Sequence, residues 1–295
     1  MSAAAGLPQV LLVTLGYVDV VCTALAGGLY DPTGKADFSI FGSTDMHMRY
    51  VPIAAEVKPN AARSGYTMCL PIDGACASMQ SNIAASLNIG WILVIACEAG
   101  DLAGARTSRK TLLNGLDTKI LAAQPWQAIF PYILEAGERG PFLDPNARAQ
   151  FIGLSSRIGL LCVVRAVYEG LAFAARDCYA ASGSASEEVR IGGGAARSAA
   201  PRTIVAAALG SQVRGSSRQE LGSAGAAMMA AVCSGVYPGV GACAEDWVAP
   251  SLRATTASDP DLVDKYAKAC PIYRMAREAM TPATAKLAEL KGEDH

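Results

Sequence analysis

Histidine and charged residues are scarce in this sequence of 295 residues, which has two histidines and only 17% Asp, Glu, Lys and Arg. The histidines are His47 and His295, so a zinc site built from several histidines is excluded. A Ser-His-Asp or Cys-His catalytic site would have to depend on His47 alone. The 25 basic and 26 acidic residues almost cancel, which argues against a protein that coats nucleic acid or binds membranes through a basic surface.

The sequence also lacks a long hydrophobic run and a C-x-x-C pair. The best candidate for a membrane span, residues 158–175, is interrupted by Arg165 and Glu169, short of the roughly 20 apolar residues that a span needs. Residues 1–5 contain no basic segment of the signal-peptide type. The nine scattered cysteines are typical of reduced thiols in a cytosolic protein. We therefore expect a cytoplasmic protein that binds neither membranes nor nucleic acid.

Hydrophobic residues and glycine are abundant, at 52% of the chain and 29 residues, and they suffice for a sizeable core. The clearest helical pattern covers residues 160–181, where Leu160, Val164 and Val167 share one apolar stripe. We expect strands at 9–15, within 36–72, at 188–191 and at 212–214, and helices at 18–28, 75–97, 107–123, 160–181, 198–209, 223–233 and within 261–290. This alternation predicts an α/β fold.

Asp19 is the first candidate for a functional residue, because it follows Gly16 where a predicted strand meets a helix of small residues. An acidic residue at such a junction is commonly a helix N-cap. It can equally be a carboxylate general base that a substrate approaches at the helix end. The local sequence leaves both interpretations open.

Two glycine-containing segments are candidate phosphate or nucleotide loops. In Gly42-Ser43-Thr44, glycine allows a backbone to approach a ligand closely, and the hydroxyls can donate to phosphate oxygens. Residues 190–198 combine a strand, three glycines and a helix start, a geometry that can present backbone N–H groups to an anion. That segment matches neither G-x-G-x-x-G nor a Walker motif. Ordinary tight turns remain the alternative for both.

Several longer stretches follow a recognisable order along the chain. They are Gly137-Glu138-Arg139-Gly140-Pro141, Asp144-Pro145-Asn146-Ala147-Arg148, Phe151-Ile152-Gly153-Leu154, Arg165-Ala166-Val167-Tyr168-Glu169-Gly170-Leu171-Ala172-Phe173, Glu220 with Gly222 and Gly225-Ala226-Ala227, and Gly235-Val236-Tyr237. Together with the three candidate sites, they resemble the C-terminal lobe of the FGGY carbohydrate kinases, members of the actin-like ATPase superfamily. The resemblance extends over about residues 7–290.

The resemblance implies an actin-like ATPase (ribonuclease H-like) lobe, in which helices flank a mixed sheet. It further implies that a sugar or polyol hydroxyl is phosphorylated with ATP and Mg²⁺ in a cleft between two lobes. Asp19 matches the family's catalytic aspartate, which accepts the proton of the attacking hydroxyl. The phosphate-contacting hairpin of the family matches Gly42, Ser43 and Thr44, and its adenosine loop matches Gly193, Gly194, Ala195 and Ser198. This division of roles suits phosphoryl transfer, which depends on positioning, charge stabilisation and a base.

Within the family, the sequence is most similar to erythritol-type polyol kinases, through Met46-His47-Met48, Arg63-Ser64-Gly65-Tyr66-Thr67-Met68 and residues 135–142. Met46 and His47 follow the phosphate hairpin and are candidates to line the polyol site. A buried core histidine is the alternative for His47. A xylulose or ribulose kinase is the alternative within the enzyme class.

Two features depart from the family pattern. Asp45 stands where a small neutral residue is usual, and a carboxylate beside the γ-phosphate would repel it unless magnesium intervened. Family members are also about twice as long, with an N-terminal lobe that carries a first phosphate loop and much of the sugar pocket. We expect residues 1–250 to form the nucleotide-binding lobe, residues 251–295 to be a helical tail of that lobe, and the N-terminal sugar-binding lobe to be absent.

The missing lobe leads to two further expectations. The chain should need a partner lobe or self-associate as a homo-oligomer, through apolar surface where the lobe would dock. A non-catalytic orphan lobe that binds nucleotide or a partner protein is the alternative from a different class of function. Glu138, Arg139, Asp144 and Arg148 are expected to form a structural ion-pair and capping network rather than to act in catalysis.

Overall fold

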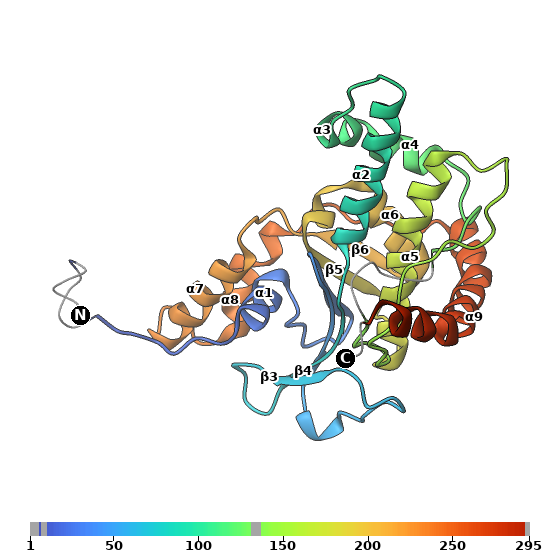
Figure 1. Cartoon of the computed structure of the whole chain (residues 1–295). Coiled ribbons are helices and arrows are strands. Elements are labelled where there is room, and N and C mark those ends of the chain that lie inside the picture. The colour runs from blue at the N-terminus through green and yellow to red at the C-terminus, as the bar shows by residue number, and fades with distance from the viewer. Residues whose placement is uncertain (1–5, 7–10, 131–136, 293–295) are drawn as a thin grey trace.

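A mixed six-stranded sheet forms the centre of the chain, whose computed structural model describes residue 6 and residues 11–130 and 137–292 (Figure 1). The strands lie in the order β3-β4-β2-β1-β5-β6. Their bounds are β1 Ala36–Phe41, β2 Asp45–Val51, β3 Tyr66–Cys69, β4 Cys76–Asn82, β5 Glu188–Gly193 and β6 Gln212–Gly215. β5 pairs in parallel with both β1 and β6, whereas the β1–β2, β2–β4 and β3–β4 pairs are antiparallel. The predicted α/β class is confirmed.

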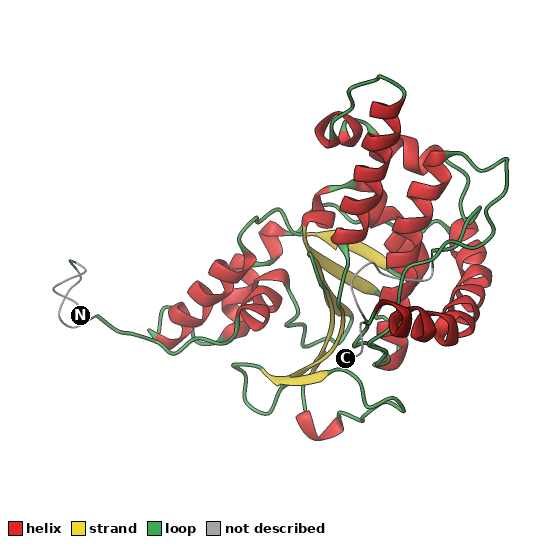
Figure 2. Cartoon of the chain, in the orientation of Figure 1, coloured by secondary structure: helices red, strands yellow, loops and turns green. Residues whose placement is uncertain are grey.

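Helices cover both faces of the sheet (Figure 2). They are α1 Asp19–Gly27, α2 Ser86–Leu102, α3 Arg109–Leu113, α4 Leu116–Ala122, α5 Leu160–Ala181, α6 Ala199–Leu209, α7 Leu221–Cys233, α8 Val240–Trp247 and α9 Pro260–Lys291. Short 3-10 helices occur at η2 Ala54–Glu56, η3 Gly194–Arg197 and η4 Ala249–Ser251. On one face lie α1, α7 and α8, and on the other lie α5, α6 and α9 (Figure 1).

Each face of the sheet contributes to its own hydrophobic cluster because strand side chains alternate. Phe38 and its cross-strand partner Met48 pack with α1 and α7, and both are fully buried. Val189 and Ile191 of β5 face the opposite way, into the cluster of α5, α6 and α9. Tyr266 and Tyr273 bring the long C-terminal helix α9 into that second cluster.

Glycine allows close helix packing at two positions of the family signature. A Cβ on Gly225 of α7 would overlap the backbone carbonyl of Cys22 in α1, so only glycine fits this helix–helix contact. A Cβ on Gly170 of α5 would likewise overlap the carbonyl of Phe130. These glycines therefore set the distance between neighbouring elements.

Several predicted elements are confirmed, and others differ from the structure. The helix expected at 160–181 is α5, and those at 198–209 and 223–233 are α6 and α7 to within two residues. Residues 11–15 of the expected strand 9–15 are not a strand and are largely exposed, while residues 9 and 10 lie outside the described part. The helix expected at 75–97 begins only at Ser86, because β4 occupies Cys76–Asn82. Helix α8 was not predicted.

The search for membrane-spanning elements gives a negative result within the described residues. None of the helices there combines the length and the apolar character that crossing a membrane requires.

Candidate active site

The hairpin between β1 and β2 carries Gly42, Ser43 and Thr44 at one end of the sheet. Its backbone is anchored to the start of α2, since Ala85 N donates to Ser43 O at 2.8 Å and Ser86 N donates to Gly42 O at 3.0 Å. Ser43 is exposed and Thr44 half-buried. Neither hydroxyl is hydrogen-bonded to any other described residue. The hairpin is thus fixed in place, with two hydroxyls free to donate to a ligand.

Parallel pairing of β1 and β5 places the glycine loop beside this hairpin. Phe41, which precedes Gly42, is the register partner of Gly193. Gly193 has φ +85°, and a Cβ there would overlap the Phe41 carbonyl, so glycine is required by both conformation and space. Gly194 is exposed, and a Cβ built on it meets no atom within 4 Å. The two predicted loops are therefore adjacent, and the space beside Gly194 is open to a ligand.

The remaining two residues of the predicted adenosine loop follow directly. Ala195 lies in η3, and Ser198 is the residue before α6. Ser198 Oγ donates to Asp117 Oδ1 at 2.5 Å, and Ala199 N donates to Asp117 Oδ2 at 2.6 Å. Asp117, from α4, thus satisfies an N–H group at the start of α6. Sequence reasoning did not single out Asp117, because nothing in its local pattern links it to a segment 80 residues away.

Asp19 is exposed at the start of α1, and the helix N-cap is Val18. The N-cap interpretation of Asp19 is therefore wrong, although its Oδ1 accepts a 2.8 Å hydrogen bond from Val20 N. Helix α1 contacts the sheet at its other end, where Gly27 faces Phe38, about 12 Å along the helix axis. Within the described residues, no hydrogen bond or ion pair joins Asp19 to either loop. The described residues thus bring the two loops together without a hydrogen bond or ion pair from Asp19 to either.

Asp45, next to the phosphate hairpin, points into the core. It is 1% exposed, and neither carboxyl oxygen has a hydrogen-bond partner within the described part of the chain. Burial, reinforced by the nearby charge of Glu138, raises the pKa of Asp45 well above its ordinary value. The expected repulsion of the γ-phosphate is therefore not supported, because this carboxyl group faces the core and its burial opposes ionisation.

Met46 and His47 lie on opposite faces of β2. Met46 packs with the α1–α7 cluster, and His47 lies on the α5 side at 1% exposure. His47 Nδ1 is 3.0 Å from Ser39 Oγ, and the imidazole ring lies against the rings of Phe41 and Tyr179. Burial lowers the pKa of His47 to about 4, so the ring is neutral. A residue without exposed surface cannot line a substrate pocket, so the proposed substrate role of His47 is not supported.

Much of the family signature forms the framework that holds these loops. Glu138 is buried and accepts hydrogen bonds from Ile83 N at 3.0 Å and Asn82 Nδ2 at 3.0 Å. Arg139 donates to Ser81 Oγ at 2.8 Å. The structural role expected for this segment is thus a network of hydrogen bonds to the end of β4. Residues 135 and 136 of the erythritol-type stretch lie outside the described residues.

The second part of the signature stabilises α5 against its neighbours. Arg165 and Glu169 form a buried ion pair at 2.7 Å. Arg165 Nη1 also donates to the carbonyls of Ile120 and Ala123, and Tyr266 Oη donates to Glu169 Oε1 at 2.7 Å. These bonds join α4, α5 and α9, and none faces the loops.

Comparison with known proteins identifies the family. The model of the FGGY family of carbohydrate kinases, C-terminal domain, matches residues 39–234. Erythritol kinase from Brucella abortus is 46% identical over 98% of this chain and 56% of the relative. Thus the chain spans little more than half the length of this curated relative.

Solved structures show the same fold. Gluconate kinase from Lactobacillus acidophilus superposes with a TM-score of 0.82 at 18% identity, over 97% of this chain and 55% of that protein. Xylulose kinase from the same organism superposes with a TM-score of 0.81 at 19% identity, with the same coverage. The sheet flanked by helices is therefore the actin-like ATPase fold of these sugar kinases. With more than half of its residues matched by the family model, the chain belongs to the FGGY family of carbohydrate kinases.

Proposed function

We propose that this chain is the C-terminal, nucleotide-binding lobe of a kinase that phosphorylates a sugar or polyol hydroxyl with ATP, an erythritol-like polyol being favoured. The observation that carries the proposal is the pairing of Phe41 with Gly193, which puts the hairpin and the glycine loop side by side. The 46% identity to erythritol kinase supports the substrate class. Residues 1–250 would form the lobe and residues 251–295 its tail.

The residues at the two loops fit a nucleotide. The free hydroxyls of Ser43 and Thr44 would donate to phosphate oxygens from a hairpin whose backbone is bonded to the start of α2. Gly193 and Gly194 would let the nucleotide approach the backbone, with Ala195 and Ser198 bordering it. ATP, when bound with Mg²⁺, would supply the phosphoryl group. Magnesium at kinase sites is held largely by phosphate oxygens and one or two carboxylates.

Asp19 would act as the general base of this reaction. Its exposed carboxylate is available to accept the proton of a substrate hydroxyl as the oxygen attacks phosphorus. Because Asp19 does not contact the loops, a second lobe would have to hold the substrate between them. The proposed partner is therefore the N-terminal lobe that longer members of the family carry, and the proposed location is the cytoplasm.

Nucleotide binding can be tested on this chain without the second lobe. Gly194→Val adds bulk where a Cβ has no neighbours, so the fold should persist while the nucleotide is blocked. Gly159→Val is a matched control, because a Cβ there also has open space and lies at the start of α5. Calorimetric titration with ATP should show at least a tenfold loss of affinity for Gly194→Val only. Equal affinities for both variants and the parent would contradict the proposed site.

Substrate class can be tested in a graft of this chain onto the N-terminal lobe of a close relative. ADP release is measured with erythritol, glycerol, xylulose and ribulose. Preferred turnover of erythritol would support the proposal, and preferred turnover of xylulose or ribulose would favour a ketopentose kinase. A graft that binds ATP but turns over no substrate would favour a non-catalytic nucleotide-binding lobe.

A further inference from the structure

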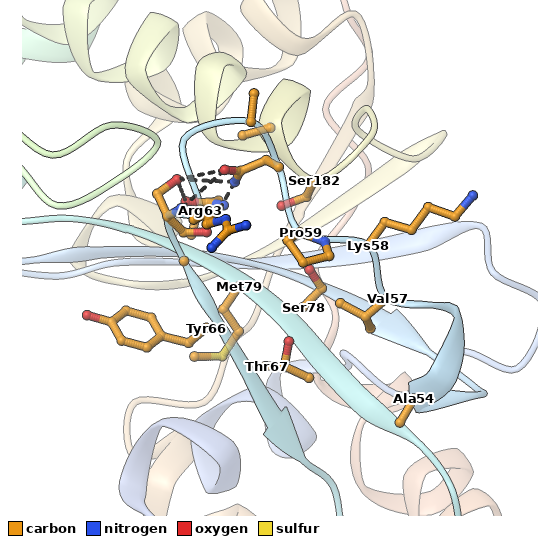
Figure 3. Close-up of a pocket in the computed structure, with 16 residues that line it drawn as sticks. Ala54, Val57, Lys58, Pro59, Arg63, Tyr66, Thr67, Ser78, Met79 and Ser182 are labelled. Atoms are coloured by element: carbon orange, nitrogen blue, oxygen red, sulfur yellow. Dashed lines mark hydrogen bonds between the residues drawn. The ribbon is translucent and has the colours of Figure 1, made fainter.

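A large cavity of about 860 Å³ lies away from both loops, on the α5 side of the β3–β4 edge (Figure 3). Residues 54, 57–61 and 63–65 of the connection from β2 to β3, with Tyr66 and Thr67 at the start of β3, form one wall. Ser78, Met79 and Gln80 of β4 form the floor, and Ala181 and Ser182 close it at the end of α5. The volume is within the range of small-molecule sites. Strand β2 separates the cavity from the hairpin, since Asp45 follows the hairpin and Val51 leads into the wall.

The cavity has a one-sided charge. Lys58 and Arg63 are among its lining residues, and the lining contains no Asp or Glu. Both side chains are exposed, and they lie toward opposite ends of the cavity in Figure 3. Neither one forms an ion pair or a side-chain hydrogen bond within the described residues. Two uncompensated cations around one cavity favour an anionic ligand.

Hydroxyl and amide groups supply the rest of the polar lining. Thr67, Ser78 and Asn60 all line the cavity. Ser182 Oγ is buried and has no hydrogen-bond partner among the described residues, so a lining hydroxyl is left unsatisfied. The α5 end would repel an anion through its carbonyl dipoles, but Arg49 Nη1 donates to Ser182 O at 2.8 Å and offsets this. Hydroxyl groups on a ligand would match this lining.

The wall that carries Arg63 is held in one conformation. Asn60 Oδ1 accepts from Ser64 N, and Asn60 Nδ2 donates to Ser64 O, each at 3.1 Å. Ser64 Oγ donates to Pro141 O at 2.7 Å, which ties the wall to the signature segment. Arg63 itself has φ +48°, an uncommon conformation for a residue with a long side chain. The backbone that carries Arg63 is therefore held before any ligand binds, so that only the side chain has to be ordered on binding.

We propose that this cavity binds a small organic phosphate with several hydroxyl groups, at a site separate from the nucleotide loops. The phosphate contacts Arg63, Lys58 at the other end of the cavity adds to its positive charge, and the hydroxyls of the ligand contact Ser182, Ser78 and Thr67. The site lies wholly within this chain, so ligand binding here does not depend on the proposed kinase reaction.

The test uses glycerol 3-phosphate as the probe, with glycerol and inorganic phosphate for comparison, in calorimetric titrations of the whole chain. The variant Lys58→Gln/Arg63→Asn removes both charges, and asparagine tolerates the positive φ at position 63. Arg106→Asn is the matched control, because Arg106 is also exposed with positive φ but lies between α2 and α3. Circular dichroism confirms that each variant is folded, and Arg63→Lys tests whether charge alone restores binding.

We expect saturable binding of glycerol 3-phosphate, weaker binding of inorganic phosphate and none of glycerol. The double variant should lose at least tenfold in affinity, since each lost charge-assisted hydrogen bond costs about that much or more. Arg106→Asn should bind as the parent does. No binding by the parent, or equal binding by the double variant, would overturn the proposal. ATP affinity of the double variant should be unchanged, so this outcome is independent of the proposed nucleotide site.

Discussion

A buried carboxyl group without a hydrogen-bond partner costs stability, and Asp45 carries one directly after the proposed phosphate hairpin. Its neighbours on the inner side include Glu138 and Cys178, and the Cys178 thiol is itself buried with a pKa raised well above its usual value. Cross-strand pairing of Asp45 with Asn82 fixes the carboxyl group in this setting. Burial therefore opposes ionisation of Asp45 in the folded state.

Asp45→Asn should stabilise the chain increasingly as pH rises. In the unfolded chain the carboxyl group has its ordinary pKa of 3.8, whereas in the native state the pKa is raised. Between pH 3.8 and the raised native pKa, the native state still binds the proton that the unfolded state has released. The free energy of unfolding of the parent therefore falls with pH, by at most about 1.4 kcal/mol per pH unit from this group. The Asp45→Asn variant has no carboxyl group at this position, so its free energy of unfolding does not fall with pH for this reason.

Thermal unfolding of the two proteins between pH 4.5 and 8 measures this difference. Asp73→Asn serves as the control, because it makes the same substitution at a carboxylate that is exposed in a turn. A constant difference between Asp45→Asn and the parent across this range would mean that Asp45 is not kept protonated by folding.

Asp19→Asn should abolish turnover without affecting the fold. Asp19 is exposed and its one hydrogen bond, from Val20 N, can be accepted equally by an asparagine oxygen. If Asp19 is the base, kcat of the grafted two-lobe enzyme should fall by roughly two to four orders of magnitude. ATP affinity should stay the same or improve, because a negative charge is removed. Similar kcat values for both grafts would exclude Asp19 as the base.

At this scale, sequence reasoning predicted the two loops better than the substrate residues. The pairing of Phe41 with Gly193, which brings the two loops together, follows from topology that a family resemblance supplies. The inward direction of His47 could not be predicted, because a one-residue change of strand register exchanges the two faces. Side chains alternate between the two faces along a strand, but the sequence around Met46 and His47 does not show which of the two faces the neighbouring helix.

Among the elements, long amphipathic helices were predictable and short buried strands were not. Helix α5 has a clear apolar stripe, and its observed bounds equal the predicted ones. Strand β4 is buried on both faces, so Cys76–Asn82 shows no alternation, and its small residues give it a helical composition. Residues 11–15 have strand-like composition but no partner strand within the described residues, so they do not form a strand.

The packing of α1 against α7 gives a test at the scale of elements. A Cβ on Gly225 would overlap the Cys22 carbonyl, so Gly225→Ala should destabilise the fold by about 1–3 kcal/mol. Gly222→Ala is the matched control on the same helix, since its Cβ would sit 3.4 Å from Thr23 Oγ1, an ordinary contact. Alanine there should be neutral or stabilise by up to about 1 kcal/mol through helix propensity. If urea denaturation gives the same free energy of unfolding for both variants, α1 and α7 can move apart at little cost.

For the whole molecule, the chain covers 56% of the erythritol kinase that it resembles. We expect the purified 295-residue chain to show no measurable polyol kinase activity. Without a second lobe, nothing aligns a substrate hydroxyl with the bound γ-phosphate, and alignment supplies much of the rate. ADP release with erythritol, glycerol, xylulose and ribulose tests this. Robust turnover of any of them would show that one lobe suffices.

The same chain should self-associate through its exposed apolar segment before α1. Leu12, Val13 and Leu15 are 62%, 84% and 96% exposed, and they are close together in sequence. Contiguous apolar surface of this kind is unfavourable in water, and covering it against a second copy or a partner lobe removes that cost. Light scattering of the purified chain should therefore give a mass above that of the monomer of 30.5 kDa.

Serine at positions 12, 13 and 15 should shift this equilibrium toward the monomer. The matched control is Leu290→Ser, which removes a side chain that is 85% exposed near the end of α9. If association is driven by the segment before α1, only the triple variant should become monomeric. Adding a separately produced N-terminal lobe of a relative should likewise reduce the self-association of the parent, because the added lobe and a second copy of the chain compete for the same surface. A parent chain that is monomeric and binds no hydrophobic dye would remove the reason to expect a docked lobe at this segment.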